Sequence, residues 1–121
     1  KGWENHMMQY NQIDVALDPI PYGGATTTCE ALVMGVPIIT LSGEGMVGQL
    51  SASILDSAGL NEWITHSKDE YINKAKIIAN SIIDNRLTCK QLLRSKVRKS
   101  ALSDARRVTR NLEKIYYDAT R

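Results

Sequence analysis

The sequence predicts an α/β fold in which a small parallel sheet is followed by C-terminal helices. Short apolar, β-prone runs alternate with helical segments up to about residue 66, and only helical patterns follow. Alternation of this kind is typical of βαβ units, whose strands run parallel. We therefore expect an α/β part at residues 1–66 and a helical part at residues 67–121.

The first strand is expected at residues 13–18, because the run IDVALD is β-prone and prolines follow it closely. Residues 19–25, PIPYGGA, have the Pro and Gly content of a loop. A helix is expected over residues 26–34, because Gly35 can cap its C-terminus and Pro37 lies just beyond.

A second apolar strand, PIITL, is expected at residues 37–41. A loop at residues 42–45 should lead into a helix over residues 46–57, which Gly59 closes. Residues 62–65 are long enough for a short third strand. This order of elements gives two successive βαβ units.

Three helices are expected in the remainder of the chain. The first follows Ser67, which forms a capping box with Glu70. The second should cover residues 88–100, and the third should begin near Ser103 and Asp104. The apolar faces of the first and third helices comprise Tyr71, Ala75, Ile78, Ala79 and Ile82, and Val108, Leu112, Ile115 and Tyr116.

The composition excludes several classes of protein. Of the 121 residues, 43% are hydrophobic, which is enough for a packed core. No apolar run reaches the roughly 18 residues of a membrane span, and no signal segment is visible, so we expect a cytoplasmic protein. The two cysteines and two histidines lack the spacing of a metal site, and we expect reduced thiols. Because the chain begins with Lys1, we expect it to be part of a larger protein.

Charge is distributed unevenly along the chain. Residues 1–85 carry four Lys or Arg against ten Asp or Glu, whereas residues 86–121 carry eleven against three. A basic tail of this kind can contact nucleic acid or an acidic neighbouring domain. We favour the neighbouring domain, because the basic residues lie on helices that also have ordinary apolar stripes.

The most informative segment is DPIPYGGATTTCEAL, residues 18–32, which joins a strand end, a glycine loop and a Thr-rich helix start. In open α/β sheets, ligands bind at the carboxyl ends of the strands. The unpaired N–H groups and the dipole of a helix N-terminus attract anions. Gly23 and Gly24 allow close approach of the backbone, and the Thr hydroxyls add hydrogen-bond donors. The pattern favours a site for a phosphate or diphosphate.

A purely structural interpretation fits the same residues. Thr27 and Glu30 have the spacing of a capping box, with Thr27 as N-cap and Glu30 bonded back to its N–H. Glu30 also lies one turn into the helix, where a carboxylate can accept hydrogen bonds from ribose hydroxyls. The spacing alone leaves both roles open.

The segment YNQIDVALDPIPYGGATTTCEALVMGVPIITLSGEG resembles the C-terminal catalytic lobe of the O-GlcNAc transferase and Spindly family. The shared features are the P-Y-[NG]-G loop, the Thr run, C-E-A-L and M-G-V-P-[VI]-[IV]-T-L. The similarity extends from about His6 to the final helix. The combination of a rare loop with this spacing makes the match specific.

The resemblance implies a GT-B architecture of two Rossmann-like lobes, usually preceded by tetratricopeptide repeats. The chain would be the C-terminal lobe and would bind a nucleotide-sugar donor, UDP-GlcNAc, without a metal ion or other cofactor. Transfer would be inverting and directed to Ser or Thr of an acceptor protein. The catalytic groups and the acceptor groove would lie outside the chain, so the chain alone should be inactive. Surfaces that the missing parts normally cover should make it self-associate.

The resemblance also assigns residues to the donor-nucleotide site. Thr26 and Thr27 match threonines that contact the phosphates. Glu30 matches the acidic residue that holds the ribose, and His6 matches a histidine near the uracil. Ala25 stands where animal members have His, but it keeps its backbone N–H. The expected site comprises His6, Gly24, Ala25, Thr26, Thr27 and Glu30, with no metal ligand and no catalytic residue.

Three positions depart from the pattern of the animal members. Trp3 replaces a Lys that contacts the nucleotide, and Gln9 and Gln49 each replace an Arg. The lost positive charge weakens the case for tight donor binding and for an unchanged sugar preference.

Other functions remain open on the sequence alone. One alternative is a related transferase that uses GDP-fucose, as Spindly proteins do, or an Asn acceptor. Another is a non-catalytic helical interaction or nucleic-acid-binding module that uses the basic tail. Salt-dependent binding to nonspecific DNA or RNA would favour the module. Saturable binding of UDP would favour the transferase.

Overall fold

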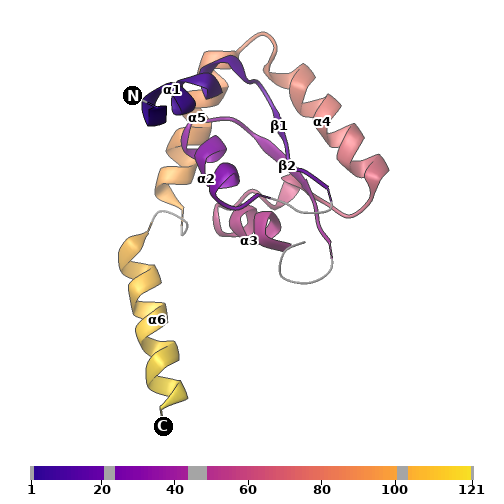
Figure 1. Ribbon diagram of the computed structural model, residues 1–121. Helices are drawn as coiled ribbons and strands as arrows, with labels where there is room; N and C mark the ends of the chain where they lie inside the picture. Colours follow the sequence, from indigo (N-terminus) through magenta and orange to yellow (C-terminus); the bar gives the residue numbers. More distant parts are fainter. Residues whose placement is uncertain (1, 21–23, 44–48, 101–103, 121) are drawn as a thin grey trace.

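A computed structural model describes residues 2–20, 24–43, 49–100 and 104–120 of the chain (Figure 1). Its sheet has three parallel strands in the order β1-β2-β3. The strands are β1 (Ala16–Leu17), β2 (Ile38–Leu41) and β3 (Ile64–Thr65). The predicted α/β fold with a parallel sheet is confirmed.

The register of the sheet centres on β2. Ala16 of β1 pairs with Ile38, and Thr40 pairs with Ile64 of β3. The first strand is shorter than the predicted range of 13–18, because Ile13 still belongs to the end of a preceding 3-10 helix. Backbone pairing nevertheless continues to Asp18, whose N–H donates to the Ile39 carbonyl at 3.0 Å.

Two crossover helices connect the strands, namely α2 (Thr26–Val33) and α3 (Leu50–Ser57). As predicted, each is followed by a glycine with positive φ, +77° at Gly35 and +74° at Gly59. The start of the helix predicted over residues 46–57 lies outside the described residues, as do Pro21, Tyr22 and Gly23 of the predicted loop.

The N-terminal segment contains two elements that the sequence did not predict. They are α1 (Gly2–Met8) and the 3-10 helix η1 (Gln9–Gln12). In η1 the side chain of Tyr10 is buried. A further 3-10 helix, η3 (Asn61–Trp63), precedes β3.

The C-terminal helices are α4 (Lys68–Ile82), α5 (Arg86–Lys99) and α6 (Ala105–Ala119). The N-cap half of the predicted capping box is present, because Ser67 Oγ accepts from the Glu70 N–H at 3.1 Å. The Glu70 carboxylate reaches back one residue further than predicted and accepts from the His66 N–H at 3.2 Å. Asp104 caps α6 in the same way, by accepting from the Arg107 N–H at 3.0 Å. The second helix begins two residues before the predicted Thr88.

The helices cover both sides of the sheet. α4 packs against β2 and β3 on one side, whereas α2 and α3 pack against β2 on the other, and α5 packs on α2 (Figure 1). The main core lies between these elements. It comprises Leu32, Ile38, Leu55, Ala58, Leu60, Leu93 and Val97.

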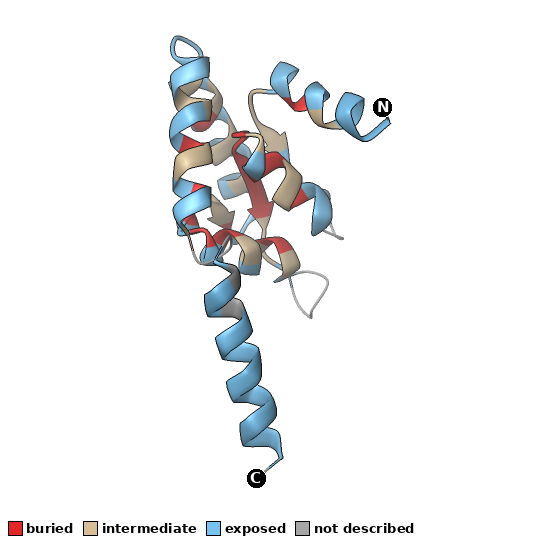
Figure 2. Ribbon diagram, turned by 90° about the vertical axis from the view of Figure 1, so that its left-hand side faces the viewer, coloured by how far each residue is buried: buried red, intermediate tan, exposed pale blue. Residues whose placement is uncertain are grey.

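α6 extends away from this body and is exposed along its described length (Figure 2). Of its predicted apolar stripe, Leu112, Ile115 and Tyr116 are 46%, 60% and 67% exposed. The side chain of Val108 lies outside the described part of the structure. The predicted stripe therefore lies on a helix, as expected. Leu112, Ile115 and Tyr116 are nevertheless not covered by the described residues of the other elements.

Gly35 allows α2 and α5 to approach each other closely. A Cβ at this position would lie 2.5 Å from the carbonyl oxygen of Lys90, which is backbone and cannot swing aside. Gly59 has nearly the same φ, but the nearest atom to its Cβ position is Lys96 Cε at 3.8 Å. The two glycines thus share a backbone conformation and differ in the space around them.

This difference predicts unequal costs for two alanine substitutions. Gly59→Ala should lower the free energy of unfolding by about 1–2 kcal/mol, because only the left-handed backbone is strained. Gly35→Ala should cost roughly 2–4 kcal/mol, because the contact with α5 is added to the same strain. Urea denaturation of both variants measures the difference. Equal losses of stability would show that the close approach to Lys90 contributes nothing.

The exposed stripe on α6 leads to a prediction about the isolated chain. Apolar residues at helical spacing that remain exposed favour association between molecules. We expect residues 1–121 to form dimers or larger species in sedimentation experiments. Ile115→Glu should shift the distribution toward monomer, and Glu113→Gln on the same helix should not. A monomer at all concentrations would contradict the expectation.

Candidate functional site

The loop after β1 is held by one buried carboxylate, that of Asp18. Its Oδ1 accepts from the Gly24 N–H at 2.8 Å, and its Oδ2 accepts from the Thr40 hydroxyl at 2.7 Å. The Asp18 carbonyl accepts from the Tyr71 hydroxyl of α4 at 2.6 Å. Burial, and then the charge of Asp18, raise the pKa of Tyr71, so its phenol keeps the proton that it donates. Asp18 therefore fixes the start of α2 relative to β2 and α4.

Two buried hydroxyls, one on α2 and one on α3, hold Gly24 of the same loop. Ser51 Oγ donates to the Gly24 carbonyl at 2.6 Å, and Thr28 Oγ1 lies 3.2 Å from that carbonyl and 2.9 Å from Ser51 Oγ. Both the N–H and the carbonyl of Gly24 are thus bonded. A Cβ on Gly24 would lie 2.1 Å from Thr27 Oγ1, so the absence of a side chain leaves room for that hydroxyl.

The N-terminus of α2 carries no side-chain cap. Its N-cap residue is Ala25, and the Cys29 N–H donates to the Ala25 carbonyl at 3.1 Å as an intrahelical bond. The N–H groups of the first helical turn have no carbonyl partner within the helix and point out of its end. Thr26 and Thr27 are exposed there. The helix end therefore carries two exposed hydroxyls, and no side chain caps its backbone N–H groups.

Glu30 lies beside two aromatic donors from the N-terminal segment. His6 Nε2 donates to Glu30 Oε2 at 2.6 Å, and the Tyr10 hydroxyl donates to the same oxygen at 3.2 Å. The Glu30 side chain is 11% exposed, whereas that of His6 is 47% exposed. Burial, followed by the charge of Glu30, raises the pKa of the adjacent Cys29 thiol. The structure thus brings together the two residues expected at the ribose and the base.

The capping box predicted at Thr27 and Glu30 as an alternative is wrong. The helix begins two residues earlier than that box requires, because Thr28 and Ser51 hold the carbonyl of Gly24. The Glu30 carboxylate bonds to His6 and Tyr10 rather than to the N–H of Thr27.

The positions that depart from the family pattern lie on the surface. Trp3, Gln9 and Gln49 are all exposed. The Trp3 ring lies 6.1 Å from that of His6, and the His6 ring lies edge-on to Tyr10 at 5.8 Å. Three aromatic rings therefore form a row from the surface to Glu30.

Sequence reasoning missed several residues that shape the site, notably Tyr10, Ser51 and Tyr71 as hydrogen-bond donors. Tyr10 is four residues after His6, a spacing that places both on one helical face. The spacing is informative only if the segment is helical, and the sequence did not predict α1 and η1. Ser51 and Tyr71 contact the loop across 27 and 53 residues, and no local pattern reveals such contacts.

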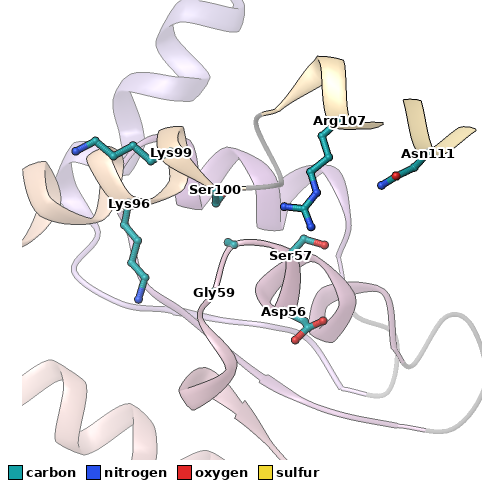
Figure 3. A pocket seen from close by; sticks show the side chains of 9 residues that line it. Asp56, Ser57, Gly59, Lys96, Lys99, Ser100, Arg107 and Asn111 are labelled. Atoms are coloured by element: carbon teal, nitrogen blue, oxygen red, sulfur yellow. The ribbon is translucent and has the colours of Figure 1, made fainter. Parts of the chain in front are cut away.

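A separate hollow of about 780 Å³ lies where α3, α5 and α6 meet (Figure 3). It contains none of the predicted site residues, but Lys96, Lys99 and Arg107 of the basic tail line it. Their side chains point in different directions, with Arg107 toward Ser57 and Lys99 away from it (Figure 3). The basic groups of the tail therefore do not converge on one point here.

Two features are absent from the described residues. Among them, no group of three or more His, Cys, Asp or Glu side chains is arranged to hold a metal ion. No helix in the described ranges is both long and apolar enough to cross a membrane.

Comparison with known proteins gives the family. A mutant of the Thermobaculum terrenum O-GlcNAc transferase is similar in structure, with a TM-score of 0.72 and 36% identity over 95% of this chain and 23% of that one. The fold is thus that of a lobe of a GT-B glycosyltransferase. A family model described as glycosyl transferase family 41 matches residues 2–112. The chain belongs to glycosyl transferase family 41, and the resemblance inferred from the sequence is confirmed.

Curated plant relatives agree with this assignment. The probable UDP-N-acetylglucosamine–peptide N-acetylglucosaminyltransferase SPINDLY of Solanum lycopersicum is 38% identical over 112 residues. The protein named SEC, of the same described activity, from Arabidopsis thaliana is 33% identical over 113 residues. Each alignment covers 93% of this chain, and the chain spans 12% of the length of each relative.

The loop geometry predicts very different roles for two aspartates of the β1 region. Asp18→Ala leaves the Gly24 N–H and the Thr40 hydroxyl without their acceptor and should lower the free energy of unfolding by roughly 2–3 kcal/mol. Asp14→Ala removes an ion pair with Arg86, 3.1 Å long and on partly exposed side chains, together with the attraction of the Asp14 charge for Lys90, and should cost at most about 0.5 kcal/mol. Thermal and urea unfolding compare them. Similar costs would contradict the anchoring role of Asp18.

Proposed function

We propose that this chain provides the donor-nucleotide site of a protein O-glycosyltransferase that uses UDP-GlcNAc. The observation that carries the proposal is the pairing of an uncapped helix N-terminus with a nearly buried carboxylate one turn further along the same helix. An anion fits the first feature, and a polyhydroxylated sugar fits the second. A nucleoside diphosphate contains both groups next to each other.

The helix N-terminus and the Glu30 carboxylate would bind different parts of the nucleotide. The diphosphate would accept hydrogen bonds from the first N–H groups of α2 and from the hydroxyls of Thr26 and Thr27. Ribose hydroxyls would donate to Glu30, and the base would lie against His6. Hydrogen bonds aimed at the diphosphate would also stabilise the negative charge that develops on it as the sugar leaves. Ala25 would contribute its backbone N–H at the same helix end, whereas Gly24, whose N–H and carbonyl are bonded within the chain, would leave room for the Thr27 hydroxyl.

The family and the relatives support the finer parts of the proposal. The relatives described above are named for transfer of N-acetylglucosamine from UDP-N-acetylglucosamine to peptides. We extend this donor and a protein acceptor to the present chain, together with a cytoplasmic location and a polypeptide that includes a second lobe and tetratricopeptide repeats. We also propose that donor binding requires no metal ion.

Substitution of Glu30 tests the proposed site. Glu30→Gln keeps an oxygen that can accept from His6 and Tyr10, so the stability should change by about 1 kcal/mol or less. The negative charge toward the ribose is lost, so UDP should bind more weakly by roughly 1.5–3 kcal/mol. Calorimetric titration of UDP into the full-length wild-type and variant proteins measures this difference.

Two further titrations sharpen the result. Glu62→Gln replaces an exposed glutamate outside the proposed site and should leave UDP affinity unchanged. GDP in place of UDP tests the choice of base, since tighter binding of GDP would contradict the proposed donor. Equal UDP affinity in the wild-type and Glu30→Gln proteins would remove Glu30 from the site.

A further inference from the structure

Tyr10 contacts the carboxylate of Glu30 from within the core. The Tyr10 hydroxyl and His6 Nε2 both donate to Oε2, at 3.2 Å and 2.6 Å. Among the described residues, no side chain or backbone donor is bonded to Oε1. The described residues thus engage the carboxylate on one oxygen only.

The position of Tyr10 does not depend on Glu30. Its side chain is buried in a small cluster with Ala31 and Val36, next to Met7 and Met34. The Tyr10 backbone is also held, because Lys90 Nζ of α5 donates to the carbonyls of Tyr10 at 3.0 Å and Ile13 at 2.8 Å.

The two donors differ in their freedom to move. His6 is half exposed and lies on α1 at the surface, so a ligand that contacts the imidazole can displace it from Glu30. Tyr10 is buried and cannot leave without opening the cluster around it. Burial, and then the hydrogen bond to Glu30, raise the pKa of Tyr10, so the phenol stays protonated at neutral pH.

We propose that Tyr10 is a positioning residue, which holds Oε2 of Glu30 on the core side and thereby turns Oε1 toward the ribose hydroxyls of the donor nucleotide. The inference rests on the proposed donor site. Without the phenol, the carboxylate is free to rotate when His6 engages the base. Affinity for the ribose then falls, although Glu30 itself is unchanged.

Tyr10→Phe isolates this role, because the ring and its packing remain. Calorimetry on the full-length protein would compare UDP with 2′,3′-dideoxy-UDP. The analogue lacks the ribose hydroxyls that would donate hydrogen bonds to Glu30. We expect UDP to bind about 3- to 10-fold more weakly to Tyr10→Phe than to wild type, as for one lost hydrogen bond to a charged group. Binding of the dideoxy analogue should not change. If Tyr10 had a purely structural role, Tyr10→Phe would bind both ligands more weakly by the same factor.

A double-mutant cycle and a matched control complete the test. Adding Tyr10→Phe to Glu30→Gln should have no further effect on UDP affinity, because Tyr10 acts through the carboxylate. Tyr116→Phe, on the exposed face of α6, should behave as wild type.

Three results would overturn the inference. One is unchanged UDP affinity in Tyr10→Phe, and another is an equal loss for the dideoxy analogue. The third is unfolding of Tyr10→Phe in thermal melts, which would assign the hydroxyl to stability. In each case UDP binding by the wild type would leave the proposed function standing. Absence of UDP binding by the wild type would overturn both.

Discussion

The buried carboxylate of Asp18 is the interaction on which the rest of the site depends. A carboxylate in the protein interior is costly unless donors surround it, so its bonds to Gly24 and Thr40 are requirements of the fold rather than additions to it. Satisfying them holds Gly24, just before α2, against the end of β1. The Asp18 carbonyl meanwhile accepts from Tyr71 and ties α4 to the same strand end. A single residue thus fixes the helix N-terminus relative to the sheet.

The other end of the site is supported by a different part of the chain. Glu30 is held by His6 and Tyr10, and the segment that carries them is held by Lys90 of α5. The helices that follow the sheet therefore do more than cover it. α4 supports the end expected to bind phosphate, and α5 supports the end expected to bind the nucleoside.

Local signals explain which parts of this arrangement could be predicted from the sequence. The parallel strands, the glycines that end α2 and α3, and the Ser67 capping box follow from patterns within a few residues. α1 and η1 were missed because their contacts come from Glu30 and Lys90, which are distant in sequence. The capping box at Thr27 was wrong for the same reason, since Ser51 on another helix decides where α2 begins. The candidate site residues could be listed from the resemblance, but the donors that hold them could not.

The charges at the candidate site limit what this chain would contribute to the proposed donor binding. The groups at the start of α2 are backbone N–H groups and neutral hydroxyls, and Trp3, Gln9 and Gln49 add no charge where the family pattern has Lys or Arg. A helix terminus stabilises an exposed anion by only about 0.3–1 kcal/mol, whereas micromolar binding requires about 8 kcal/mol. In the proposed site, the ribose and base contacts would therefore provide much of the affinity within this chain. In the proposed longer protein, a compensating positive charge at the diphosphate would come from residues outside this chain, which spans 12% of the length of the tomato relative.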